Sequence, residues 1–135
     1  MTAQVDYISQ TKNRLVVKYT SGVTGGDVNF SVGPNVFGPT GGEFATRGLT
    51  YTSAALSRIY YAIGGTSGHV AINYVAGSGL ETAWILPADS TGEINLERMT
   101  VPNSTTGGTG YAQFDNNLSA EKHAVILAEF VTQHK

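Results

Sequence analysis

The stretch RLVVKYT at residues 14–20 decides the fold class, because its side chains alternate between apolar and polar. Leu15, Val17 and Tyr19 take every second position, and Val16 is the one apolar residue between them. A β-strand points successive side chains to opposite faces, so this pattern is typical of a strand with one buried face and one solvated face. The stretch therefore predicts an antiparallel sheet covered on one side.

The same period-two alternation recurs at residues 28–32, 70–74 and 93–97, and glycine-rich turn sequences separate these runs. β-branched and aromatic residues fill the runs, in agreement with strand propensity. Short strands at this spacing predict an all-β fold, either an antiparallel β-sandwich or a jelly-roll-like arrangement, with about eight strands.

Residues 53–63 fit a strand or a helix, because apolar residues such as Leu56 and Ile59 also have helical spacing. The sequence GGTSG at residues 64–68 reads as the loop of a hairpin that returns through residues 69–76. A hairpin needs a strand before its loop, so we expect a strand here.

Residues 119–131 also fit either structure, because their apolar side chains allow a helical face. As a strand, the segment would place Val125, Leu127 and Val131 on one face, with Glu129 interrupting it. The family resemblance given below favours the strand.

Length and composition bound the domain organisation. The chain has 135 residues, which predicts one domain over residues 1–135 that is large enough to bury a core. Only 13% of the residues are charged, about half the usual ~25%. There is no cysteine, which excludes disulfides and cysteine-based zinc sites.

The charge pattern argues against two classes of partner. The formal net charge is −2, and the arginines stand far apart in the sequence, so we expect no binding to nucleic acid. No apolar run approaches the roughly 20 residues that span a bilayer, and the first residues do not form a signal peptide. We therefore expect no membrane association.

Sequence motifs for catalysis and cofactor binding are absent. The nucleophile motif Gly-x-Ser-x-Gly and the phosphate-binding motif Gly-x-x-x-x-Gly-Lys do not occur. His69, His123 and His134 lack the spacing of a helical zinc site. Residues 115–117, Asp-Asn-Asn, offer oxygen ligands for calcium but lack the EF-hand pattern, so a turn is the better interpretation. We expect no catalytic residue, metal or cofactor, and an enzyme is the least favoured alternative.

The longest irregular stretch covers residues 33–48 and contains two prolines and two phenylalanines. A loop of this length in a small domain is usually functional or disordered. Tyr60 and Tyr61 must point to opposite faces of a strand, so one of them should be exposed. Aromatic residues are enriched at protein interfaces. The predicted partner interface is therefore Pro34, Phe37, Pro39, Phe44 and Tyr60. Anchoring of the loop by its own phenylalanines is an equally good interpretation.

The single tryptophan, Trp84, lies among apolar neighbours, so we expect it in the core rather than on a sugar-binding platform. A carbohydrate- or peptide-binding β-sandwich module, which would use Trp84, Tyr60 and Tyr61, is nevertheless kept as an alternative function.

The order of segments along the chain carries a resemblance to a known class of proteins. The segments are QVDYIS at residues 4–9, RLVVKY at 14–19, IYY at 59–61, GGTGYAQF at 107–114 and AVILAEFV at 124–131. In this layout, and in its nearly charge-free middle, the chain resembles the small virion structural proteins of tailed phages, particularly marine phages. Capsid decoration (cement) proteins are one branch of that class.

The resemblance implies a β-sandwich or jelly roll that attaches to a shell or tail and is made in the bacterial host cytoplasm. It implies a virion location and, as partner, the major capsid protein or another virion protein. Self-association is also expected, with a trimer as the working assumption. The leading hypothesis is a capsid decoration protein on the outer shell, and a tail, neck or knob component is the alternative.

Overall fold

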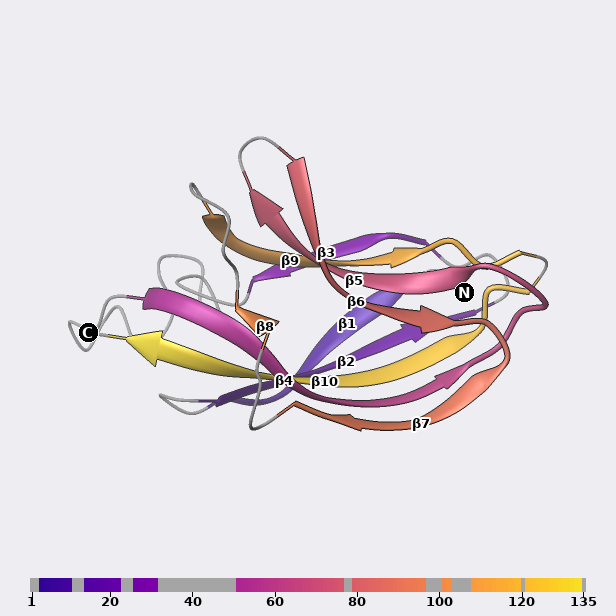
Figure 1. Ribbon diagram of the computed structural model, residues 1–135, viewed down its shortest axis with the longest axis horizontal. Coiled ribbons are helices and arrows are strands. Elements are labelled where there is room, and N and C mark those ends of the chain that lie inside the picture. Colours follow the sequence, from indigo (N-terminus) through magenta and orange to yellow (C-terminus); the bar gives the residue numbers. More distant parts are fainter. Residues whose placement is uncertain are drawn as a thin grey trace.

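The computed structural model is a two-layer sandwich of antiparallel sheets (Figure 1). It describes residues 3–10, 14–22, 26–31, 51–76, 79–96, 101–102, 108–119 and 121–134. Every regular element in these residues is a strand, so the predicted all-β sandwich is confirmed. The described residues hold no helix that is long and apolar enough to cross a membrane.

The first layer, sheet A, has the strand order β1-β2-β10-β4-β7, and the two-residue strand β8 also pairs with β4. All of these pairings are antiparallel. The strands are β1 (Gln4–Gln10), β2 (Arg14–Ser21), β4 (Tyr51–Ile63), β7 (Ser90–Asn95), β8 (Val101–Pro102) and β10 (Ala124–His134).

The second layer, sheet B, has the strand order β3-β9-β5-β6 and is also antiparallel. Its strands are β3 (Val28–Ser31), β5 (His69–Ala76), β6 (Gly79–Pro87) and β9 (Gly108–Asn116). The chain passes repeatedly between the two layers, so each sheet is assembled from segments far apart in sequence.

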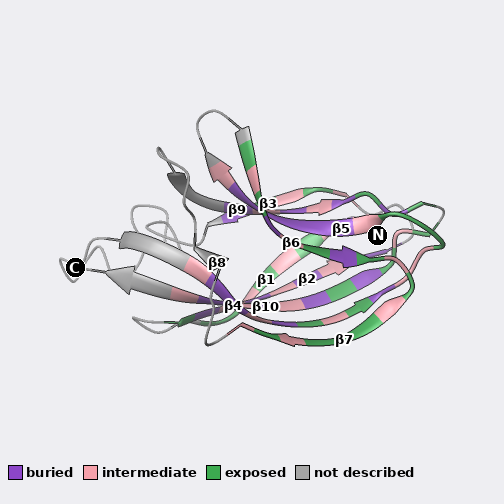
Figure 2. Cartoon of the chain, viewed as in Figure 1, coloured by how far each residue is buried: buried purple, intermediate pink, exposed green. Residues whose placement is uncertain are grey.

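The core lies between the sheets and follows the predicted alternation in β2, where Leu15, Val17 and Tyr19 are fully buried. In β5, Val70, Ile72 and Tyr74 are fully buried, but Ala71 and Asn73 between them are buried as well, so the solvated face expected there is absent. Figure 2 shows buried residues alternating with exposed or half-buried ones along β10. Burial of one such large side chain contributes about 1.5–3 kcal/mol, so these side chains contribute substantially to the stability of the sandwich.

Aromatic rings fill the centre of this core. Phe114 of β9 stacks on Tyr19 at a centroid distance of 4.8 Å and on Phe30 at 5.0 Å. Phe130 of β10 makes edge-to-face contacts with Phe30 and Tyr74, at centroid distances of 5.9 Å and 6.4 Å. Offset and edge-to-face pairs add to the energy of area burial, so this cluster joins the two sheets tightly.

Both ambiguous segments are strands, as expected: residues 53–63 belong to β4, and residues 124–131 of the second segment belong to β10. The two strands pair with each other, and β10 also pairs with β2. β10 therefore lies at the centre of sheet A.

The predicted hairpin at residues 64–68 is wrong, because β4 lies in sheet A and β5 in sheet B. β4 already pairs with β10 on one side and with β7 on the other, so it has no free edge for β5. The GGTSG link instead carries the chain from one sheet to the other. Gly68 has a φ of +90° there, which glycine adopts at little cost.

The crossing link is tied to two other connections between the sheets. The amide of Ala88 donates to the carbonyl of Gly68 at 3.0 Å, and the amide of Asp89 donates to Gly64 at 3.0 Å. The amide of Ser119 donates to Ser67 at 3.0 Å. These backbone bonds close one end of the sandwich, and buried backbone groups need such partners.

Register shifts interrupt the ladders at five places among the described residues. The pairing registers leave Ile8 as the extra residue on β1, Ala83 on β6 and Ser57 on β4. At the β4 bulge the amide of Leu56 donates to the hydroxyl of the buried Tyr74 at 2.8 Å, which links sheet A to sheet B. Bulges on the edge strands β1 and β6 hinder pairing with further strands.

Candidate protein-docking surface

Of the five residues predicted at a partner interface, the structure describes Tyr60. The other four, Pro34, Phe37, Pro39 and Phe44, lie in residues 33–48, outside the described residues. Tyr60 is 42% exposed on the outer face of β4, whereas Tyr61 points to the other face and packs on the core. The alternation of the two tyrosines is therefore as predicted.

Tyr60 belongs to an apolar group that we call the outer patch, formed by Tyr60, Ala62, Val125 and Leu127. The register between β4 and β10 places Leu127 opposite Tyr60 and Val125 opposite Ala62. Opposite residues of antiparallel strands have Cβ atoms about 4.5–5.5 Å apart, so the four side chains are neighbours. Val125 is 42% exposed, like Tyr60.

A shallow hollow of about 270 Å³ lies in the outer patch, and Tyr61 and Gly92 complete its lining. Gly92 is opposite Tyr61 in the β4–β7 pairing, and a Cβ atom there would lie 3.1 Å from the Tyr61 hydroxyl oxygen. The absence of a side chain at Gly92 thus leaves room for the Tyr61 ring at this edge of the sheet. The hollow is an open depression of the surface and not an enclosed cavity.

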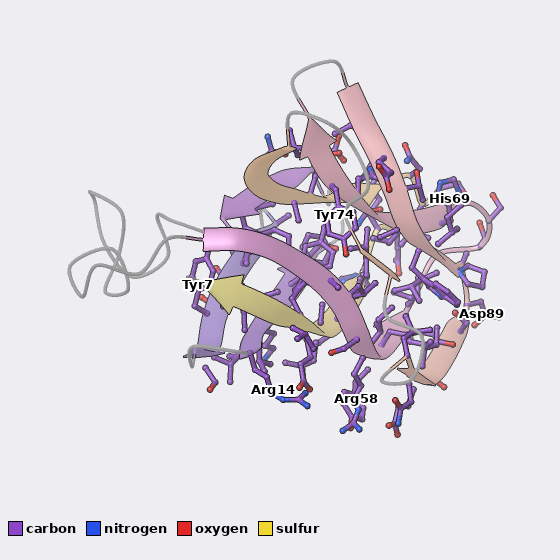
Figure 3. The ribbon with its side chains drawn as sticks, turned by 60° about the vertical axis from the view of Figure 1, so that its left-hand side comes forward. Tyr7, Arg14, Arg58, His69, Tyr74 and Asp89 are labelled. Atoms are coloured by element: carbon purple, nitrogen blue, oxygen red, sulfur yellow. The ribbon has the colours of Figure 1, made fainter. Side chains whose placement is uncertain are left out.

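Charged side chains surround the outer patch on the same face. Arg14 of β2 pairs with Glu129 of β10, and the Arg58 Nε lies 3.9 Å from Glu93 Oε1 across β4 and β7. Arg58 Nη1 also donates to the Tyr60 hydroxyl at 3.3 Å. Figure 3 shows Arg14 and Arg58 projecting from the same side of the sandwich.

A third pair of charges completes this rim. Lys18 of β2 lies opposite Asp6 of β1 in the pairing register. Among the described residues, the rim therefore holds three cationic and three anionic side chains, whose charges balance around the apolar centre. Apolar centres with polar rims are typical of protein interfaces.

The structure shows which face of β10 enters the core. Val125, Leu127 and Val131 do share a face, but it is the outer one, where Val125 is exposed. The core instead takes Ala124, Ile126, Ala128 and Phe130, which are at most 2% exposed. Of this set, Ile126 and Phe130 are the large side chains, and Phe130 packs against Phe30 and Tyr74 between the sheets.

Sequence reasoning therefore missed three residues of the outer patch, Ala62, Val125 and Leu127. A signal for two of them was present, because residues 124–128 read AVILA without a polar residue. Such unbroken apolar runs are typical of strands covered on both faces. In a single copy, β10 is covered on one face among the described residues.

The aromatic residues considered for a sugar platform do not come together. Trp84 lies on β6 of sheet B, partly buried against the core as expected, and Tyr61 packs on the core from sheet A. Tyr60 points away from both, toward the outside of sheet A.

The histidines and the Asp-Asn-Asn segment lie at or next to the ends of strands. His69 opens β5, and His123 precedes β10 with its Nε2 atom 4.0 Å from the exposed Glu121. The Asn116 side chain accepts from the amide of Leu118 at 3.1 Å, which confirms the predicted turn. Within the described ranges, no three histidine, aspartate or glutamate side chains are placed to hold a metal ion together.

Asn116 is 3% exposed and connects the two sheets through its side-chain amide. The amide nitrogen donates to the Tyr19 hydroxyl at 3.2 Å, to Ser21 Oγ at 3.1 Å and to the Lys122 carbonyl at 3.0 Å. These bonds satisfy a buried polar group, so Asn116 stabilises the fold and has a structural role.

Next to this network, the pKa of Asp27 is raised above its ordinary value. Desolvation of the carboxyl is the main cause, and the neighbouring Asp115 adds to it. The amide of Asn116, which donates to Asp27 Oδ1 at 3.0 Å, and the Lys122 charge act in the opposite direction.

Comparisons with known proteins add no relative to this description. No protein-family model matches the chain, and neither the curated proteins nor the solved structures contain a significant match.

Proposed function

We propose that this chain is a non-enzymatic structural protein of a tailed-phage virion, specifically a capsid decoration protein bound to the outer shell. The observation that carries the proposal is the outer patch, in which Tyr60 and Val125 are exposed side by side with Ala62 and Leu127. The solvated face of an antiparallel sheet is normally polar. Apolar patches rimmed by polar groups mark sites of protein contact.

Two further observations support this proposal. The layout of the chain resembles small virion proteins of tailed phages, which are β-sandwiches or jelly rolls that attach to a shell or tail. The chain is also poor in charge, with 13% charged residues, which suits a protein that packs beside many other proteins. In this proposal the chain is made in the bacterial host cytoplasm and then joins the virion, where its partner is the major capsid protein or another virion protein.

Protein analysis of purified phage particles tests the proposal. Mature particles would be separated from unassembled protein, digested with protease and analysed by mass spectrometry. We expect peptides of this chain in the particles, and their absence would refute the virion assignment. Electron microscopy of the same particles would then locate the sandwich on the outer shell.

Copy number separates the shell from the tail. A decoration protein that follows the shell symmetry should be present on the order of hundreds of times per particle, whereas a tail, neck or knob component occurs about a dozen times or fewer. Quantitative mass spectrometry against the major capsid protein provides this ratio. A low ratio would keep the chain in the virion but reject the decoration role.

A further inference from the structure

The central strand of sheet A has the composition of a strand covered on both faces. β10 places Ala124, Ile126 and Ala128 in the core, and on its other face Val125 and Leu127 are also apolar. Its neighbour β2 is different, because its outer positions include Arg14 and Lys18. The apolar outer surface is thus concentrated at the middle of the sheet, where a partner would bury it most completely.

We propose that a second copy of this chain covers the outer face of sheet A, with the two outer patches in contact about a two-fold axis. This inference rests on the proposed function only in assigning the outer patch to a protein contact. It names a second copy as the partner at the outer patch and replaces the assumed trimer with a pair, so that the proposed contact with the shell falls to another surface of the chain.

The charges on this face fit a second copy. Three cations and three anions surround the outer patch, and Arg14–Glu129 and Arg58–Glu93 are already paired within one copy. An identical face therefore meets no net repulsion. A strongly acidic or basic partner would instead find no excess of opposite charge on this face.

The size of the face also fits a second copy. Five strands spaced about 4.8 Å apart span roughly 24 Å, and residues 125–131 at about 3.3 Å per residue span roughly 23 Å. Each copy would then bury about 550 Å², and the pair about 1,100 Å². A biological interface generally needs about 1,000 Å² in total, so two such faces suffice for a pair of modest affinity.

The edges of the sandwich are less suited to self-association than this face. The bulges at Ile8 on β1 and at Ala83 on β6 interrupt the two longest edge strands. A bulged edge cannot continue a regular ladder with another strand. Contact through the face requires no backbone pairing.

The hollow in the outer patch would also lie inside the contact. Tyr60 is one of the residues that line this open hollow of about 270 Å³. In a two-fold contact, each patch meets the same patch of the other copy. The two hollows and their Tyr60 side chains would therefore face each other across the axis.

Sedimentation equilibrium of the purified full chain over a wide concentration range tests the pairing. We expect a reversible monomer–dimer equilibrium for the unchanged protein. Val125→Glu should weaken dimerisation at least tenfold, because it places a charge in the buried centre of the contact. The matched control is Ile85→Glu, which changes a residue of similar exposure, 53% against 42%, on sheet B. The control should dimerise like the unchanged protein.

Site-specific cross-linking provides a second measurement that does not depend on a disruptive charge. The chain has no cysteine, so Ala62→Cys and Ile85→Cys each introduce a single thiol. A short bismaleimide should join two copies through residue 62 and not through residue 85. Circular dichroism would verify that each variant is folded.

Some outcomes would overturn the inference. A chain that stays monomeric at millimolar concentration, forms a trimer, or loses dimerisation equally in Val125→Glu and Ile85→Glu would refute the two-fold pairing. Binding of the outer patch to a purified capsid protein without dimerisation would also refute it. None of these results affects the detection of the chain in particles, which tests the proposed function separately.

Discussion

Gly68 should be the glycine in the crossing link that tolerates substitution least. A Cβ atom at this position would lie 2.1 Å from the carbonyl oxygen of Asn117, and real Cβ atoms essentially never approach closer than 3.0 Å. The obstacle is backbone, so it cannot rotate away as a side chain would. The φ of +90° is also one that alanine adopts with difficulty.

The expected cost of Gly68→Ala has two parts. An unfavourable backbone conformation costs about 1–3 kcal/mol. Relief of the overlap requires a shift of the chain around Asn117, and overpacking of this kind typically costs about 1–3 kcal/mol. We therefore expect a loss of about 2–6 kcal/mol in the free energy of unfolding, a large part of the 5–15 kcal/mol typical of a domain.

Gly65→Ala is the matched control, because Gly65 also has a positive φ, +78°, but its nearest contacts are at 3.3 Å. It should lose about 1–2 kcal/mol, the cost of the backbone conformation alone. Urea unfolding followed by circular dichroism and by the fluorescence of Trp84 would measure both variants. Equal destabilisation of the two variants would refute the reasoning, because the overlap with Asn117 would then cost nothing.

Three further substitutions test the interior and its charge. Tyr74→Phe removes the hydroxyl that accepts from the amide of Leu56, and the unsatisfied amide should lower the free energy of unfolding by about 1–3 kcal/mol in urea titrations. Asn116→Ala removes the donor to Tyr19 and two other acceptors, so we expect a loss of at least about 2 kcal/mol, and a loss below 0.5 kcal/mol would contradict the assigned role. For Asp27, whose pKa is raised above 3.8 mainly by desolvation, the folded state holds the proton more tightly, so its contribution to stability is greatest at low pH and declines as pH rises through the raised pKa. Asp27→Asn should therefore gain stability relative to the unchanged protein as pH rises from 3 to 7, and a difference independent of pH would contradict the assignment.

The sequence predicts strand positions well where one face is polar. At residues 14–20 the alternation reports which side chains leave water, whereas at residues 70–74 Ala71 and Asn73 on the other face are buried as well. Alternation cannot choose a face where both are apolar, as at residues 124–131. There the choice depends on which side chains complete the core, and Phe130 decides it through contacts with Phe30 and Tyr74.

The connection between β4 and β5 shows a second limit. A glycine-rich loop of this length allows a return beside the same strand or a step to the opposite sheet. Which one occurs depends on whether β4 has a free edge, and β7 and β10 occupy both of its edges. The positions of β7 and β10 depend on pairings between segments far apart in the sequence. The residues of the turn carry no information about those pairings.

The candidate surface was predictable in part. The alternation of Tyr60 and Tyr61 was enough to expect one exposed tyrosine, and Tyr60 is that residue. Its neighbours Val125 and Leu127 come from a strand far along the chain, so their contact with Tyr60 depends on the register between β4 and β10. A patch assembled across strands in this way becomes visible only when the pairing is known.

The central position of β10 has a consequence for the order in which the molecule forms. β2 and β4 do not pair with each other, and each pairs with β10, the last of the described strands to be synthesised. Ala124 at the start of β10 pairs with Ser21 across most of the chain, and such distant pairings slow folding. Before β10 is synthesised, sheet A can therefore form only as two separate parts, β1 with β2 and β4 with β7, and β2 and β4 each keep an unpaired edge. Release of this strand from the ribosome, rather than the appearance of the first strands, should start cooperative folding and end the period in which the nascent chain is vulnerable to aggregation.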